Sequence, residues 1–370
     1  MPCLAAVLVL GCGGGGSGGA SGGDGNGNGP SEGLPVQVDA IAPGFAITLM
    51  AAGLDSPAKL AQAPDGRLFV NELPGRIRVI AQDGTLDPAP FATLDVATGG
   101  ERGLLGLAFS PSFASDHFVY VVACRANPAR TQLVRLTDVA GVGSDETVIL
   151  DDLPQGEIHN GGDLLFLADG TLLVSVGETG DQDRAQADGD LAGRVLRYAQ
   201  DGSVPGDNPY PGSPEYCRGL RNTYDLALQP VTGGVFGLDN GPTHDDEMNY
   251  IKPGKNYEWP ELPPSWPQAD VGVHLHVWHD VITPTAMAIH DGTAFGADYA
   301  NNVFLCSYNL AQVRRLPMSG AQFTDIDAEE TFVQFATLDS SNKPLCILAA
   351  QDGSLWIGTF NAIWKVTRQS

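Results

Sequence analysis

The sequence has little positive charge: 20 Lys and Arg face 44 Asp and Glu, which leaves a formal net charge of −24. Such a chain repels a phosphate backbone, so charge argues against nucleic acid as a partner. No CxxC pair occurs, and no strand–GxGxxG–helix unit is present that would bind NAD. The excess of carboxylates suits a calcium-containing exterior.

What the chain has in quantity is glycine and proline, 47 and 26 of its 370 residues. This is too turn-rich for a helical bundle, and the Val, Leu and Phe content is too high for a disordered chain. No amphipathic helical pattern separates the apolar stretches, which disfavours a βαβ sheet.

A strand-like apolar triplet recurs six times after turn signals, at intervals of roughly 50 to 70 residues, and similar repeats with four short strands each are typical of propeller blades. We therefore expect an all-β fold over residues 35–370, a six-bladed β-propeller with four-stranded antiparallel blades. The segment 37–52 is expected to supply a strand to the last blade and close the ring. The central residues of the triplets are Phe69, Tyr120, Leu173, Phe236, Phe304 and Trp356.

The first residues indicate export. Residues 1–11 contain a short apolar run typical of a signal peptide, and Val9-Leu10-Gly11-Cys12 resembles a bacterial lipobox with Cys12 as the acylated residue. Residues 12–34 are expected to be a disordered Gly/Ser-rich tether. We expect a lipoprotein that is periplasmic or attached to the outer membrane, and contacts a membrane only through its lipid. The alternative is an unacylated, disordered secreted N-terminus.

Export permits disulfides, but the spacing of the cysteines beyond the tether does not reveal a pairing. Four cysteines allow three connectivities, and all three remain open at this point. The residues concerned are Cys124, Cys217, Cys306 and Cys346.

His159 precedes Gly161 and Gly162, so it can lie at a loop tip that a ligand approaches closely. Histidine is the natural base for a hydroxyl proton near neutral pH, and Glu178, after the next strand, could orient its ring. The alternative is a structural histidine.

The acidic segment 239–260 offers hard oxygen ligands of the kind that Ca²⁺ takes. Pro242 has no N–H and follows Gly241, which leaves backbone carbonyls free to face a cation. An acidic surface loop is the alternative. His274 and His276 could chelate a transition metal from one face of a strand, or belong to a partly exposed strand.

Taken together and in order, several segments resemble the soluble PQQ-dependent sugar dehydrogenases, the glucose/sorbosone dehydrogenase family. They include GERGLLGLAFSPSF, HNGGDLLFLADGTLLVSVGE, RGLRNTYDLAL and DNGPTHDDEMNYIKPGKNYEWP. The resemblance also implies a six-bladed propeller, with PQQ and Ca²⁺ as cofactors.

The resemblance implies a role for each matching residue. His159 matches the base that takes the proton of the sugar C1 hydroxyl, and Glu178 stands where the family has a supporting aspartate. The remaining matches are Gly241 and Pro242 for the calcium that bridges to the cofactor, Glu247 and Tyr257 for a structural calcium, and Arg221 and Asn222 for cofactor contacts.

The sequence departs from the family pattern at positions that would contact the three carboxylates of the cofactor. Glu101 stands where a glutamine is usual, and Asn309 where a lysine binds the cofactor. Lys343 and Leu345 match a pair of arginines, and Asp163 matches a loop arginine. Each charge-assisted hydrogen bond that is lost is worth roughly 1.5–3 kcal/mol. The residues that match the base and the calcium loop are retained, while several residues that match cofactor-binding cations are replaced.

Two functions follow as hypotheses. The first is an exported PQQ- and calcium-dependent dehydrogenase that oxidises the C1 hydroxyl of an aldose or related sugar to a lactone. It would pass electrons to an external quinone or redox protein. The second is a non-catalytic, calcium-stabilised propeller that binds a carbohydrate or a protein.

Overall fold

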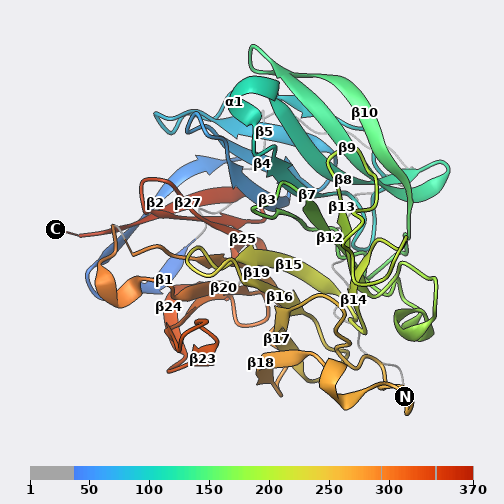
Figure 1. Cartoon of the computed structure of the whole chain (residues 1–370). Coiled ribbons are helices and arrows are strands. Elements are labelled where there is room, and N and C mark those ends of the chain that lie inside the picture. The colour runs from blue at the N-terminus through green and yellow to red at the C-terminus, as the bar shows by residue number, and fades with distance from the viewer. Residues whose placement is uncertain (1–36, 293, 338–339, 370) are drawn as a thin grey trace, which may run out of the picture.

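The computed structural model describes residues 37–292, 294–337 and 340–369, which form six antiparallel sheets arranged as a ring. The sheets follow one another in chain order, so the colour in Figure 1 runs round the ring from blue to red. The fold is the predicted six-bladed β-propeller.

The strands of each blade follow the chain from the axis outward. Blades one and two contain β3 (Pro57–Gln62), β4 (Leu68–Glu72), β5 (Arg76–Ile80), β6 (Ala92–Thr93), β7 (Leu104–Phe109), β8 (Phe118–Ala126), β9 (Ala129–Val139) and β10 (Val142–Leu153). Blades three and four contain β11 (Leu164–Phe166), β12 (Leu172–Val176), β13 (Arg194–Tyr198), β14 (Glu215–Arg218), β15 (Thr223–Leu228), β16 (Val235–Asp239), β17 (Asp246–Ile251) and β18 (Val273–Trp278). Blades five and six contain β19 (Pro284–Ile289), β20 (Val303–Ser307), β21 (Gln312–Leu316), β24 (Glu330–Phe335), β25 (Pro344–Ala349), β26 (Leu355–Thr359) and β27 (Ala362–Arg368).

The N-terminal strands close the ring. β2 (Phe45–Ala52) pairs with β27 as the outer strand of blade six, which confirms the predicted closure (Figure 1). β1 (Val38–Ile41) pairs with β24 and adds a fifth strand to blade five, which the sequence pattern did not predict. The segment 38–52 therefore ties the last two blades together.

Helical structure is minor in the described residues. It comprises α1 (Phe113–Asp116) and the short 3₁₀ turns Gln182–Gln186, Gln268–Asp270, Ala297–Tyr299 and Ser340–Asn342. A small hairpin of β22 (Met318–Ser319) and β23 (Asp325–Ile326) lies outside the blades. No helix in this part of the chain is long and apolar enough to cross a membrane.

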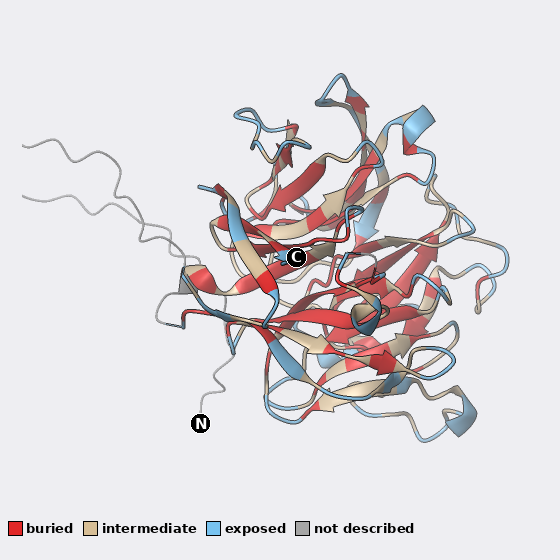
Figure 2. Ribbon diagram, turned by 90° about the vertical axis from the view of Figure 1, so that its left-hand side faces the viewer, coloured by how far each residue is buried: buried red, intermediate tan, exposed pale blue. Residues whose placement is uncertain are grey.

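The repeat predicted the buried layer of each blade. The central residue of each triplet lies in the second strand of its blade and is buried, because it packs between neighbouring sheets. Figure 2 shows buried residues along the strands and exposed residues mainly in the outer loops. Adjacent blades share this core: the cluster around Phe295, Phe304 and Phe332 continues into Trp356 and Trp364 of blade six.

The four cysteines of the propeller are free and buried, so none of the three open pairings forms among the described residues. Burial raises the pKa of each of these thiols. The predicted signal peptide, the acylated Cys12 and the tether lie outside the described residues.

Candidate active site

The loops that lead into the inner strands meet at one mouth of the ring, where they enclose a pocket of about 140 Å³. We call it the mouth pocket. Its lining comes from blades two to six, so the complete ring is needed to form it. It includes the predicted site residues Glu101, His159, Arg221, Asn222, Gly241 and Pro242, and also Leu345.

The imidazole of His159 is held from both sides. Its Nδ1 is hydrogen-bonded to Oε1 of Glu178, which also accepts the backbone N–H of Gly180 at 3.1 Å. Its Nε2 lies 3.0 Å from Nη2 of Arg221, and a guanidinium can only donate. These partners assign the proton to Nδ1 and the lone pair to Nε2, which is the tautomer a base in the mouth pocket needs.

Glu178 reaches the imidazole despite the extra methylene that distinguishes it from aspartate. Its backbone N–H donates to the carbonyl of Arg221 at 2.8 Å, so the carboxylate and the guanidinium are positioned together. The predicted pairing of His159 with Glu178 is therefore present, and Arg221 is a third member that spacing did not reveal.

Glu101 holds the backbone of the base rather than its ring. Its Oε2 accepts the N–H of His159 at 2.8 Å and Nδ2 of Asn222 at 3.1 Å. Asn222 Oδ1 in turn accepts the N–H of Gly161 at 3.1 Å. His159 has a φ of 55°, in the left-handed region that is sparsely populated by non-glycine residues. The Glu101–Asn222 pair fixes this loop conformation.

Asp239, at the end of β16, braces the Arg221–Asn222 segment. Its two oxygens accept the N–H of Arg221 at 2.9 Å and of Asn222 at 2.7 Å. Burial and the nearby Glu247 raise the pKa of Asp239 to about 7, against the lowering effect of these two N–H groups. The segment is thus held by a carboxyl group that is itself close to its titration point at neutral pH.

The carbonyls of Asn240 and Gly241, just before Pro242, converge on the guanidinium of Arg221. Nη1 of Arg221 donates to the carbonyls of Asn240 and Gly241, at 2.7 and 3.0 Å. Asp246 supports the turn by accepting the N–H of Gly241 at 2.9 Å and of Ile282 at 2.8 Å. Asp246 belongs to the acidic segment that was expected to offer oxygen ligands, and its carboxylate accepts hydrogen bonds from backbone N–H groups.

Asn240 has one polar atom without a partner. Its Nδ2 donates to the carbonyl of Pro284 at 3.1 Å, while Oδ1 is buried and has no hydrogen-bond partner among the described residues. Leaving a buried oxygen without a donor costs about 1–3 kcal/mol. Sequence reasoning did not single out Asn240, and only the neighbouring Gly-Pro pair pointed to this turn.

Glu247 and Tyr257 line a second pocket of about 250 Å³, which we call the rim pocket. Arg221, Asn240, Gly241 and Pro242 line both pockets and separate them. The Tyr257 hydroxyl bonds to the carbonyl of Tyr250 and to the N–H of Lys252, so only the backbone of Tyr257 is left to bind a metal. Oε2 of Glu247 lies 3.2 Å from Nδ1 of His274.

His274 and His276 do not meet at a common site. His274 contacts Glu247 and Glu258, whereas Nε2 of His276 lies 3.6 Å from Glu329. Among the residues the structure describes, no group of three or more His, Cys, Asp or Glu is arranged to hold a metal ion. The carboxylate partners of the two rings therefore give no support to the chelate alternative for this strand. A metal at the mouth pocket would use backbone and amide oxygens.

The opposite wall of the mouth pocket has few charges. Asn309 Nδ2 donates to the carbonyl of Val281 at 3.0 Å, and Val281 itself lines the pocket. Leu345 is buried in the same wall. Lys343, just before β25, places Nζ 4.0 Å from the centre of the Tyr308 ring. Asn309 and Lys343 are not among the residues that line the mouth pocket, so their predicted cofactor contacts stay a prediction; Lys343 is the cation two positions before the lining residue Leu345.

Asp163 does not face the mouth pocket. It lies in the central channel, where Lys59 Nζ contacts Asp163 at 2.7 Å and Asp225 at 2.5 Å. The two carboxylates also accept the N–H groups of Leu226 and Met287, so this triad joins blades one, three, four and five. In place of the matched arginine, Asp163 forms an ion pair in the channel and adds no positive charge to the mouth pocket.

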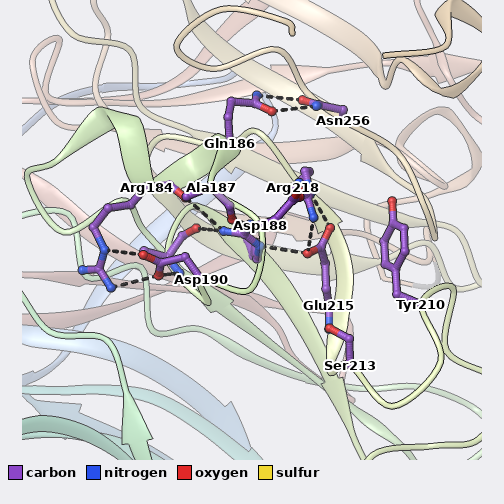
Figure 3. A network of polar contacts seen from close by, with 12 residues as sticks. Arg184, Gln186, Ala187, Asp188, Asp190, Tyr210, Ser213, Glu215, Arg218 and Asn256 are labelled. Atoms are coloured by element: carbon purple, nitrogen blue, oxygen red, sulfur yellow. Dashed lines mark hydrogen bonds and ion pairs between the residues drawn. The ribbon is translucent and has the colours of Figure 1, made fainter. Parts of the chain in front are cut away.

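A buried polar network supports the loops behind Glu178 and Tyr257 (Figure 3). Arg194 is fully buried and shares Glu215 with Arg218, at 3.0 Å and 2.6 Å. Arg194 also donates to the carbonyls of Arg184, Ala187 and Ala192, which fixes the loop after Glu178. The side-chain amides of Gln186 and Asn256 pair with each other and link this loop to the one that carries Tyr257. Sequence reasoning missed this network because basic residues in strands are usually exposed.

A propeller whose loop mouth holds an oriented histidine base beside a carbonyl-rich turn defines an enzyme-type site. Residues 54–361 match the family model described as glucose/sorbosone dehydrogenase. The chain belongs to this family of oxidoreductases.

Named relatives share part of the sequence. The chain is 29% identical to the aldose sugar dehydrogenase of Escherichia coli, over 56% of this chain and 59% of that protein. It is 29% identical to quinoprotein glucose dehydrogenase B of Acinetobacter calcoaceticus, over 57% of this chain and 51% of that protein. The chain thus spans somewhat more than half the length of these two curated relatives.

The fold of the PQQ-bound aldose sugar dehydrogenase from Streptomyces coelicolor matches with a TM-score of 0.74 at 28% identity. That match covers 89% of this chain and 99% of the other.

Proposed function

We propose that this protein is an exported PQQ- and calcium-dependent dehydrogenase that oxidises the C1 hydroxyl of an aldose or related sugar to a lactone. The observation that carries the proposal is the imidazole of His159, which has Nδ1 bound to Glu178 and the Nε2 lone pair in the mouth pocket. The family and its PQQ-bound relative support the same chemistry.

The residues present fit the cofactors. The carbonyls of Asn240 and Gly241 and the unpartnered Oδ1 of Asn240 are hard oxygens of the kind that calcium takes, and would supply part of its ligand set. Arg221 and Asn222, which line the pocket, would hold the quinone, and Lys343, two positions before the lining residue Leu345, would add a cation. When bound, PQQ supplies the two-electron acceptor for the hydride that leaves C1.

His159 performs the proton transfer. Nε2 accepts the proton of the C1 hydroxyl, and Glu178 stabilises the imidazolium that forms. In the structure Nε2 is hydrogen-bonded to Arg221, so a substrate hydroxyl must replace the guanidinium there. Glu101 and Asn222 keep the loop in place during this exchange.

The deciding experiment titrates the calcium-loaded protein with PQQ and follows the absorbance of the cofactor and dye-linked oxidation of a series of aldoses. We expect saturable PQQ binding and turnover. His159→Ala should lower turnover by at least about 10²–10⁴-fold while PQQ binding is kept. Glu178→Gln should lose less, because the amide oxygen still accepts a hydrogen bond from the Nδ1–H group but cannot stabilise the imidazolium as a carboxylate does. PQQ binding without any turnover in the wild type would refute the catalytic assignment.

The binding propeller remains the competing function because one observation favours it. On the side of blades five and six, Asn309 and Leu345 supply no positive charge and Lys343 lies outside the lining of the pocket, whereas the cofactor carries three carboxylates. Failure of the calcium-loaded protein to bind PQQ would support this alternative.

Export and lipid attachment are part of the proposal and rest on residues 1–34. Acylation of Cys12 would keep the propeller at a membrane surface, where an external quinone or redox protein can accept electrons. The protein should fractionate with membranes, and Cys12→Ser should release it. Native protein found wholly soluble and unlipidated would contradict this part alone.

A further inference from the structure

Two backbone carbonyls of the turn before Pro242 already point toward one cation. Nη1 of Arg221 is bound by the carbonyl of Asn240 at 2.7 Å and by that of Gly241 at 3.0 Å. Converging carbonyls favour a cation because their negative ends would otherwise repel one another. In the structure, the guanidinium supplies that positive charge.

The amide of Asn240 has a defined orientation. Its nitrogen can only donate, and the carbonyl of Pro284, 3.1 Å away, can only accept. The amide therefore cannot be flipped without placing two oxygens against each other. Oδ1 is left as the atom without a partner, and it is buried.

The position of Asn240 connects these two observations. Asn240 lines the mouth pocket and also the rim pocket, together with Gly241 and Pro242. Its Oδ1 belongs to the same residue as one of the converging carbonyls. An amide oxygen is a hard ligand of the kind found in calcium sites, and calcium takes six to eight such oxygens.

We propose that Oδ1 of Asn240 is a side-chain ligand of the calcium ion that the Gly241–Pro242 turn binds, a role that rests on the proposed function. Calcium then replaces Nη1 of Arg221 at the carbonyls. Pro284, at the start of β19, holds the amide in place, so blade five contributes indirectly to a metal site on blade four. Asn240 acts on the cofactor through the metal.

The experiment counts metal-bound water in the protein without PQQ. Calcium binding is measured by calorimetry, and europium(III) is used as a luminescent substitute whose decay in H₂O and D₂O reports the number of coordinated waters. Asn240→Ala should bind calcium about tenfold more weakly and hold about one more water on europium, because solvent fills the vacated position. Asn240→Asp should keep the wild-type water number.

Asn361→Ala is the matched control. Oδ1 of Asn361 is also buried without a partner, but Asn361 lines neither pocket. Its calcium affinity and europium hydration should equal those of the wild type. Asn240→Ser provides a second truncation if Asn240→Ala does not fold.

The outcomes distinguish failure of the Asn240 assignment from failure of the proposed function. If the wild type binds calcium and the truncated variants keep its affinity and water number, Asn240 is not a ligand, and the proposed function stands. If the wild type binds neither calcium nor europium, the calcium part of the proposed function fails and this inference fails with it. A raised water number in Asn240→Ala but not in Asn361→Ala supports the assignment.

Discussion

The two walls of the mouth pocket use their polar groups differently. On the side of blades three and four, the base, its carboxylate and Arg221 each have defined partners. On the side of blades five and six, Asn309 bonds to a backbone carbonyl, Leu345 is apolar and Lys343 lies against a tyrosine ring. The first wall is pre-organised for proton transfer, and the second offers little to a trianionic cofactor.

Under the proposed function, proton transfer and cofactor binding place different demands on the two walls. A base must be held in one tautomer and one orientation, which needs several fixed neighbours. A carboxylate of a cofactor can be bound by any cation within reach, so single replacements change affinity stepwise. The predictions that follow perturb the first wall, then the channel beneath it, then the second wall.

The largest effect is expected from Glu215→Gln. This change leaves the guanidinium groups of Arg194 and Arg218 without their shared carboxylate, and Arg194 is fully buried. Breaking a buried pair in this way lowers the free energy of unfolding by about 3–5 kcal/mol. Urea unfolding of the wild type and the variant measures this change in the free energy of unfolding.

The control for Glu215 is Asp188→Asn, since Asp188 also pairs with Arg218 but its side chain is 95% exposed. That change should alter the free energy of unfolding by less than about 1 kcal/mol. Equal effects of the two variants would show that the network in Figure 3 is not what stabilises this wall.

Lys59→Met tests the channel triad. Burial raises the pKa of Asp225 above its usual range, and the neighbouring Asp163 adds to this, while Lys59 opposes it. A carboxyl group with a raised pKa in the folded state stabilises the fold below its unfolded pKa, and that contribution is lost as the pH rises. Without Lys59 the pKa of Asp225 rises further, so the loss grows with pH.

We expect Lys59→Met to lower the free energy of unfolding by about 3 kcal/mol at pH 8 and by clearly less at pH 5. Urea unfolding at the two pH values measures this. The double variant Lys59→Met/Asp225→Asn should recover part of the loss at pH 8. A loss independent of pH would mean that packing of the Lys59 stem, not its charge, is responsible.

The features that depend on a local sequence pattern could be predicted from the sequence. The apolar triplets indicated six blades because each second strand must be buried between neighbouring sheets. His159 and Glu178 were singled out by their loop context, and Arg221 and Asn222 by a family resemblance. The structure brings all four together in one site.

Contacts between distant residues were not predictable in the same way. Lys59 and Asp225 are separated by 166 positions, and nothing near either residue indicates its partner. Arg194 lies in a strand whose basic residues suggest solvent exposure, yet it is buried with Glu215. The pairing of β1 with β24 depends on the space left at the edge of blade five, which no local pattern encodes.

Asn309→Lys should strengthen the second wall. A new ammonium group beside Val281 would meet a cofactor carboxylate, and one charge-assisted hydrogen bond is worth about 1.5–3 kcal/mol. The affinity for PQQ should rise about 10- to 100-fold in an equilibrium titration with calcium present. Val231→Lys, at a position that is 69% exposed and outside the pocket, is the control for added charge and should leave the affinity unchanged.

The smallest effect is expected from Lys343→Met. The ammonium group of Lys343 lies 4.0 Å from the centre of the Tyr308 ring and is half-buried, so solvent screens part of its charge. Its loss should weaken PQQ binding about fivefold, or roughly 1 kcal/mol, and the difference should shrink at high salt. Lys365→Met is the matched control, because its ammonium also lies over an aromatic ring, 5.2 Å from the centre of Trp356, and pairs with Asp352 outside the pocket. An unchanged PQQ affinity in Lys343→Met would mean that the side of blades five and six contributes no cation to PQQ binding. Arg221 and the calcium ion would then hold the cofactor.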